Sequence, residues 1–281
     1  MHARTRRSHS GFAKAAFVFW ALWKRRDLLQ VRRMEASFGI TGLVVIAYLL
    51  AGFVKGVIGM GLPTVALGLL AAVMTPAQAA AILIAPSLAT NIWQMVAGPY
   101  LFGLIKRLGG MLLGMFAGAW LGNGILTGEN AKPAAIGLGV VLIAYALIGL
   151  TKVKFTVARK TEIWLGPLVG ISTGFVMAAT GVFVIPALPY LQAIGFDKDE
   201  LVQALGLHFT VSTVALALVL WDGGAFNLSL GTLSLFAIVP AVAGMYAGQR
   251  VRARISADTF RLCLYIGLLA LGALLLGRNT I

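Results

Sequence analysis

Charged residues are scarce in this sequence of 281 residues. They make up 11% of the chain, whereas apolar residues make up 59% and the mean hydropathy is +0.92. Soluble domains carry roughly one quarter charged residues, so the composition excludes an ordinary soluble protein and indicates an integral membrane protein. At about 20 residues per crossing, the chain holds roughly eight to ten membrane segments and little soluble sequence.

Cysteine, histidine and acidic residues are also few. The chain has one cysteine (Cys263), three histidines (His2, His9 and His208) and nine acidic residues. A disulfide framework and a metal site with recognisable ligand spacing are therefore not expected. No P-loop pattern is present, and no acidic residue lies in an apolar segment, as an intramembrane hydrolase would require. We expect no enzyme activity, no catalytic residue and no cofactor.

The 23 basic residues are concentrated in a few places, and the net charge is +14. Nine lie in the first 33 positions, and most others fall in three predicted loops: Lys106-Arg107, Lys152 to Lys160, and Arg250 to Arg261. Basic residues confined to short loops between apolar segments are the positive-inside signature of membrane proteins. The lipid bilayer is thus an expected partner, and nucleic acid is not.

Residues 1–37 form a basic extension that fits no part of the apolar pattern. Gly11 to Trp23 is apolar apart from Lys14, but about 13 residues are too few to cross a bilayer. The stretch reads as an interfacial helix or a signal-like segment, or translation begins at Met34, which we favour. Residues 38–281 are predicted to form the transmembrane transport domain.

Ten apolar segments follow, and two of them are short. Leu62 to Met74 and Val182 to Ile194 hold about a dozen residues and each follows a glycine break, so each is predicted to be half of a re-entrant or broken hairpin. The others are residues 38–57, 77–97, 109–126, 134–150, 164–178, 201–220, 230–248 and 260–276.

The two halves of the chain resemble each other. Gly52-Phe53-Val54 with Gly59 and Pro63 matches Gly174-Phe175-Val176 with Gly181 and Pro186, at a spacing of 122 to 123 residues. Ala117 to Gly122 similarly matches Ala243 to Gly248. The predicted fold is all-α and polytopic, with two repeats (about 38–150 and about 164–276), each a broken hairpin plus three transmembrane helices. With the basic loops inside, the repeats are inverted, as in many transporters.

Lys55 is the single charged residue between Phe38 and Ile105. An ammonium at membrane depth costs about 3 kcal/mol, so it should face a partner or a wet cavity. We expect an anionic ligand or water beside it. The alternative is that Lys55 lies nearer the surface and snorkels, or bonds unwound carbonyls.

Two glycine breaks and two polar stripes complete the candidate site. The breaks, at Gly56, Gly59 and Gly61 and at Thr180-Gly181, would aim free N–H groups at an anion, or would only allow close packing. Ridges at Gly110, Gly114, Gly118, Gly122, Gly244 and Gly248 are read as packing only.

The stripes are Ser87, Thr90, Asn91 and Gln94, and in the second half Gln203, Thr210 and Thr213 flanked by His208 and Ser212. They line a pore or bond neighbouring helices, and His208 is either a proton carrier or structural. The predicted substrate-binding residues are Lys55, Gly59, Gly61, Asn91, Gln94, Thr180, Gly181, Gln203, His208 and Thr210.

Three features of the sequence resemble those of a known family. They are the broken segment from Ala51-Gly52-Phe53 to Gly59-Met60-Gly61 and Pro63, its second copy from Gly174-Phe175 to Gly181 and Pro186, and the glycine pairs Gly118/Gly122 and Gly244/Gly248. In these features the sequence resembles the TauE/SafE sulfite exporter family (TSUP, DUF81). The resemblance covers about Phe38 to Leu276. It implies a multi-pass permease of the bacterial inner membrane that moves sulfite, sulfonates or related small sulfur-containing anions, usually outward.

We therefore expect a secondary transporter that exports a small sulfur-containing oxyanion by alternating access. Proton and sodium coupling are both left open. The alternatives are an anion importer of the same fold, or a membrane scaffold or enzyme subunit without transport activity.

Overall fold

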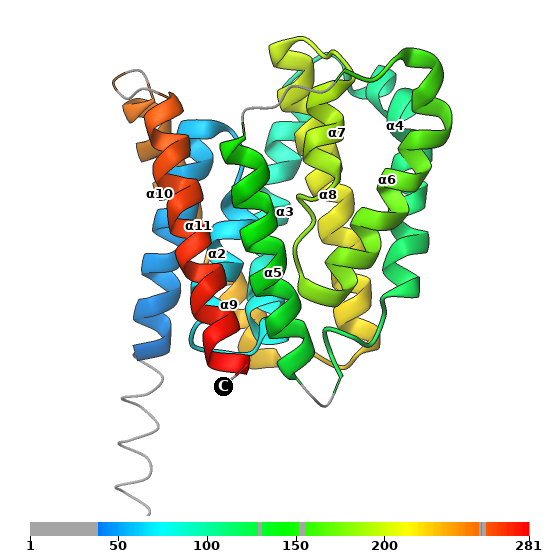
Figure 1. Cartoon of the computed structure of the whole chain (residues 1–281). Coiled ribbons are helices and arrows are strands. Elements are labelled where there is room, and N and C mark those ends of the chain that lie inside the picture. The colour runs from blue at the N-terminus through cyan, green and yellow to red at the C-terminus, as the bar shows by residue number, and fades with distance from the viewer. Residues whose placement is uncertain (1–38, 129–130, 152–155, 253, 255–256, 281) are drawn as a thin grey trace, which may run out of the picture. The chain divides into compact units, whose positions relative to one another are not determined.

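The structure is a computed structural model that describes residues 39–128, 131–151, 156–252, 254 and 257–280 (Figure 1). The predicted extension, residues 1–37, lies outside the described residues. The chain divides into the units Met1–Leu43 and Val44–Ile281. All contacts discussed below lie within the second unit.

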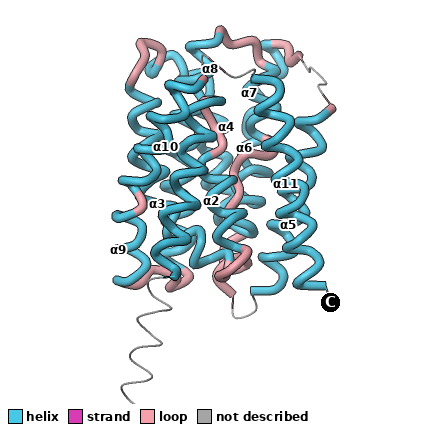
Figure 2. The backbone as a smooth tube through the Cα atoms, turned by 90° about the vertical axis from the view of Figure 1, so that its left-hand side faces the viewer, coloured by secondary structure: helices cyan, strands magenta, loops and turns pink. Residues whose placement is uncertain are grey.

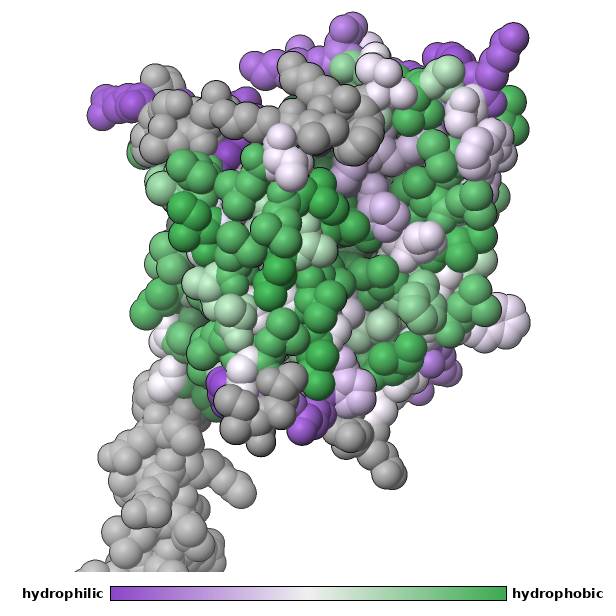
Figure 3. Space-filling view, viewed as in Figure 1, coloured by the Kyte–Doolittle hydropathy of each residue, from purple (hydrophilic) through white to green (hydrophobic). Residues whose placement is uncertain are grey.

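The described residues form helices joined by loops (Figure 2). Eight helices are long and apolar enough to cross a membrane. In the view of Figure 3, apolar side chains cover the middle of the Val44–Ile281 unit and hydrophilic ones gather at its two ends. The prediction of an all-α polytopic membrane protein is confirmed. The eight spans are Gly39–Ile58, α3 (Pro76–Val96), α4 (Leu101–Leu121), α5 (Ala131–Leu150), α6 (Arg159–Thr180), α8 (Lys198–Asp222), Leu228–Val251, and Phe260–Asn279 within α11 (Ala257–Thr280).

Both predicted breaks are present, and each precedes a short helix. The first helix ends at Ile58, and α2 (Leu62–Ala71) starts after the left-handed N-cap Gly61. In the second half, α6 ends at Thr180 and α7 (Ala187–Ala193) follows a non-helical stretch. The chain thus turns back twice within an apolar region, as the glycine patterns predicted.

Two helices begin earlier than predicted. The expected loop at Lys106-Arg107 is wrong, because α4 starts at Leu101 and includes both residues. Apolar residues 101–105 extend the helix, and the charge of Arg107 is paired with Glu162 rather than solvated. Glu162 itself lies in the first turn of α6, which starts at Arg159 and thus ahead of the predicted apolar segment 164–178.

One predicted segment contains an interruption. Residues 230–248 lie in the single span Leu228–Val251, as expected, but within it α9 (Leu228–Phe236) and α10 (Ile238–Val251) are separated by a turn at Ala237. Pro240 has no backbone N–H, so it cannot bond the carbonyl four residues earlier, at Phe236. The regular hydrogen-bond ladder is interrupted there.

Glycine ridges bring α4 against α6 in a parallel arrangement. A Cβ at Gly114 would lie 3.1 Å from Ile171 N, and one at Gly122 would lie 2.9 Å from the carbonyl of Phe175. Such distances mean that the two backbones touch, which only glycine allows. The prediction that these glycines serve helix packing is confirmed.

The first helix meets α10 through matching contacts. A Cβ at Gly52 would lie 3.0 Å from Met245 N, while one at Gly174, which is 122 residues later, would lie 2.8 Å from Ala119 N. The α5 and α11 helices lie side by side and antiparallel, since Gly139 faces Gly272 and Gly149 faces Tyr265 (Figure 1). These contacts support a duplicated arrangement, and the inverted relation of the halves stays a prediction.

Candidate functional site

Lys55 is buried in the last turn of the first helix, with 4% of its surface exposed. Its Nζ donates to Thr90 Oγ1 at 3.1 Å and to Asn91 Oδ1. Thr90 in turn donates to the carbonyl of Pro86, inside α3. Both acceptors of the ammonium are neutral, so the hydrogen bonds are satisfied in part while the charge itself is not balanced by them.

Further polar atoms on the same face of α3 lack partners. Asn91 Nδ2 and Ser87 Oγ are buried and find no hydrogen-bond partner among the described residues. Ser87 lies one helical turn before Asn91, so the two share a face. Because Asn91 Oδ1 is occupied by Lys55, its Nδ2 remains a free donor. A cation and two buried groups able to donate thus belong to one cluster, which suits an oxyanion.

Gln94 connects this cluster to the first break. Its Nε2 donates to the carbonyl of Gly59 at 3.3 Å and to that of Val202, in α8, at 2.8 Å. Val65 N donates to the Gly61 carbonyl and closes the first turn of α2. The backbone N–H groups ahead of that turn have no intrahelical acceptor, so the start of α2 is electropositive.

The second break is organised by its own polar contacts. Thr180 Oγ1 accepts from Val182 N at 3.2 Å and donates to the Val176 carbonyl. His208 Nε2 lies 2.9 Å from the carbonyl of Phe183. A carbonyl can only accept, so Nε2 carries the proton and the buried Nδ1 is left as an acceptor without a partner among the described residues.

Gln203 and Thr210 do not contact Lys55. The amide of Gln203 bonds three backbone groups around the α3–α4 connection: the carbonyls of Met95 and Gly98, and Tyr100 N. Thr210 donates to the Gly206 carbonyl within its own helix. The structure therefore brings together Lys55, Thr90 and Asn91 and joins Gln94 to Gly59. Gln203 instead ties α8 to the α3–α4 connection, and Thr210 bonds only within its own helix.

Gly59→Ala should destabilise the first break through backbone strain alone. Gly59 has φ +88°, and a Cβ there would meet nothing within 4 Å. A left-handed conformation costs a non-glycine residue about 1–2 kcal/mol, so we expect thermal unfolding in detergent a few degrees below wild type. Gly267→Ala is the control, because a Cβ there is also unhindered but the residue lies in helix α11 without a positive φ. Its unfolding midpoint should not fall below that of wild type. An unchanged midpoint for Gly59→Ala would mean that the break does not require glycine.

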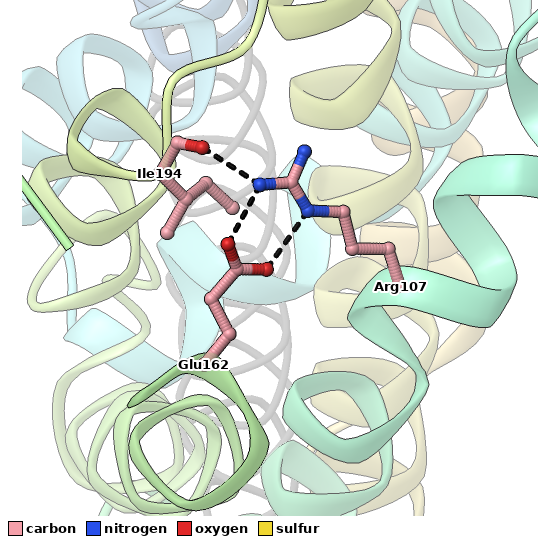
Figure 4. Close-up of polar contacts among 3 residues, drawn as sticks. All are labelled: Arg107, Glu162 and Ile194. Atoms are coloured by element: carbon pink, nitrogen blue, oxygen red, sulfur yellow. Dashed lines mark hydrogen bonds and ion pairs between the residues drawn. The ribbon is translucent and has the colours of Figure 1, made fainter. Parts of the chain in front are cut away.

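A partly buried ion pair escaped the sequence analysis. Arg107 on α4 bonds Glu162 on α6 through Nε at 2.8 Å and Nη2 at 2.7 Å (Figure 4). The Nη2 atom also donates to the carbonyl of Ile194 at 2.7 Å, and the guanidinium lies 4.5 Å from the centroid of the Phe196 ring. The available signal was a basic and an acidic residue at the edges of two apolar segments.

Two surface pockets lie elsewhere. One of about 330 Å³ is bordered by Thr75, Gln78, Thr127 and Asn227, and an apolar one of about 360 Å³ by Ile84, Phe226 and Leu235. Neither is lined by Lys55 or Asn91. Among the described residues, no group of three or more histidine, cysteine or acidic side chains could hold a metal ion. Lys55 is enclosed in this conformation, so a solute could reach it only after a rearrangement.

Comparison with known proteins agrees with the architecture. The family model described as sulfite exporter TauE/SafE matches residues 44–275, which include the first helix from Val44 and α11 up to Leu275. No curated protein and no solved structure gave a match. The matched range covers both breaks, the Lys55 cluster and the Arg107–Glu162 pair, and by this match the chain belongs to the TauE/SafE sulfite exporter family of membrane transporters.

Proposed function

We propose that this protein is a secondary transporter that exports a small sulfur-containing oxyanion, such as sulfite or an organosulfonate, across a bacterial inner membrane by alternating access. The family match supports transport of this kind. The substrate, the direction and the membrane are the further steps of the proposal. Lys55, Asn91, Gln94 and the two breaks form the substrate path in it.

The buried ammonium of Lys55 carries the proposal. Moving an ammonium out of water costs several kcal/mol, and two neutral acceptors offset only part of that cost. An oxyanion next to Nζ would neutralise the charge and accept from Asn91 Nδ2 and Ser87 Oγ, which have no partner among the described residues. If Lys55 had only a structural role, an apolar side chain of similar size would fill the same place without the cost of a buried charge.

The same cluster suits a small, compact anion better than a large one. Lys55 is 4% exposed and Ser87 and Asn91 are fully buried, so an anion beside them would be enclosed by protein on all sides. The start of α2 adds N–H groups that have no acceptor within the helix, beside the Gly59 and Gly61 break. Sulfite or the sulfonate head of a small organic molecule fits this chemistry.

Charge distribution supports one orientation in the membrane. Basic residues gather at the starts of α4 and α6 and the end of α10, which lie together at the top of Figure 1: Lys106, Arg107, Arg159, Lys160, Arg250, Arg252 and Arg254. Among the residues that the structure describes, fewer basic ones, including Lys132 and Arg278, lie at the opposite end. The positive-inside rule therefore assigns the first end to the cytoplasm.

Export can be tested with the purified chain reconstituted in vesicles and in inverted membrane vesicles. We expect uptake into inverted vesicles of at least one anion among sulfite, sulfoacetate, taurine and thiosulfate, above vesicles that lack the protein. Imposed proton and sodium gradients, applied separately, identify the coupling ion. Transport of none of these anions under either gradient would contradict the proposal, and uptake only into right-side-out vesicles would favour an importer of the same fold.

A further inference from the structure

An arginine caps the end of each short half-helix. Arg107 donates to the carbonyl of Ile194, which is the C-cap of α7, and Arg278 donates to the carbonyl of Ala72, the C-cap of α2. Ile194 follows Ala72 by 122 residues, the spacing that relates the two halves. The last carbonyls of a helix have no intrahelical donor, and a basic side chain can satisfy them.

The two caps lie at opposite ends of the unit. Arg107 stands near the start of α4, at the end rich in basic residues, whereas Arg278 stands in the last turn of α11, near the other end (Figure 1). Each arginine comes from a helix outside the hairpin that it caps. Each therefore connects a short half-helix to a long helix that spans the membrane.

The cap at α7 is reinforced. Arg107 also holds Glu162 in a bidentate pair, so one guanidinium joins α4, the start of α6 and the end of α7 (Figure 4). Its side chain is 16% exposed and that of Glu162 is 8% exposed. The pair is therefore shielded from salt more than a surface pair would be. Phe196, just beyond α7, covers the guanidinium face.

We infer that Arg107 with Glu162, and Arg278, are positioning residues that hold the ends of α7 and α2 closed on opposite sides of the membrane. Release of the Arg107 cap lets the end of α7 move and opens the cytoplasmic side. Release of the Arg278 cap frees the end of α2 and opens the outer side. The inference rests on the proposed transport function, in which only one side opens at a time.

Two alanines provide matched reporters. Ala71 and Ala193 are the last residues of α2 and α7, they are 122 residues apart, and they are 8% and 7% exposed. In a Cys263→Ser background, Ala71→Cys or Ala193→Cys is the single thiol. A membrane-impermeant maleimide, applied from one side at a time, measures how open each end is without any substrate.

The double variant Arg107→Gln/Glu162→Gln removes the first cap without leaving an unpaired charge. We expect it to raise labelling of Ala193→Cys from the cytoplasmic side by about tenfold, the size of a typical conformational coupling, and to leave Ala71→Cys unchanged. Arg278→Gln should do the reverse, raising labelling of Ala71→Cys from the outer side. Arg107→Lys keeps the positive charge but loses the two parallel N–H groups of the guanidinium. Labelling of Ala193→Cys in this variant should be between that of wild type and that of the double variant.

Two results would overturn the inference. One is labelling at wild-type rates in both the double variant and Arg278→Gln, which lack one cap each. The other is a rise at both reporters together in either variant, which would mean general loosening. A merely structural pair would give one of these. The labelling needs no transported anion, so a chain that moves none of the tested anions can still show the caps. If the labelling disproves the role of the caps, the transport proposal is still tested separately by the flux measurement.

Discussion

Lys55→Met should lower anion flux by about a hundredfold while the protein still folds. Removing one partner of a buried charged contact typically costs about 2–5 kcal/mol of binding. Lys55 Nζ is the charged member of the cluster with Thr90 and Asn91, so its loss removes the attraction for an oxyanion. The measurement is the initial rate of uptake into inverted vesicles over a range of anion concentrations.

Methionine is chosen because the equivalent position in the second half of the chain is a buried methionine. Met177 follows Lys55 by 122 residues, and it is fully buried on α6 before the second break. Methionine removes the buried charge but also leaves Asn91 Oδ1 without its donor, so the two effects oppose each other and the variant should unfold within a few degrees of wild type. Lys106→Met, at an exposed position of α4, is the control and should keep normal flux. Unchanged flux and affinity in Lys55→Met would remove Lys55 from the site.

Gly118→Val should lower the thermal unfolding midpoint by about 10 °C or prevent insertion. A Cβ at Gly118 would meet the carbonyl of Ile171, with its carbonyl carbon at 2.7 Å and its Cα at 2.9 Å. These are backbone atoms that cannot move aside, so α4 and α6 must separate. Overpacking costs about 1–3 kcal/mol or more, and each kcal/mol shifts the midpoint by about 2–4 °C at this size. Size-exclusion fluorescence after heating in detergent measures the change.

Two variants make the Gly118 result interpretable. Gly103→Val lies in the same helix, where a Cβ meets nothing within 4 Å, so its midpoint should stay within a few degrees of wild type. Gly244→Val faces Leu49 and Phe53 across the first helix and α10, in the same way that Gly118 faces Ile171. It should be impaired to a similar degree. A normal midpoint for Gly244→Val would contradict equivalent packing in the two halves.

Sequence reasoning located the breaks because they depend on local chemistry. Gly59, Gly61 and Gly181 adopt positive φ, and such positions favour glycine whatever surrounds them. Helix starts were less predictable. Lys106 and Arg107 were taken to seek water, yet Arg107 finds a carboxylate within the protein, so the helix continues through them. The hydropathy of a residue is the same whether or not its charge is paired, so the local sequence did not indicate this ion pair.

The candidate site was predictable as a set of residues and not as a set of contacts. Lys55 stood out by its charge, and Asn91 and Gln94 by their spacing along one helix face. That Lys55 meets Asn91 depends on how the first helix slides against α3, which a single sequence does not encode locally. The Arg107–Glu162 pair likewise requires α4 and α6 to lie parallel in one register, which their glycine contacts set.

The glycine contacts also show which parts of the chain pack against each other inside the molecule. The pairings of α4 with α6, of the first helix with α10, and of α5 with α11 each join a residue range before 151 to one after 158. The closest backbone contacts of each half are thus made with the other half. Synthesis up to Leu150 leaves bare helix backbones in contact with lipid, and the nascent chain acquires its stability only when the second half arrives.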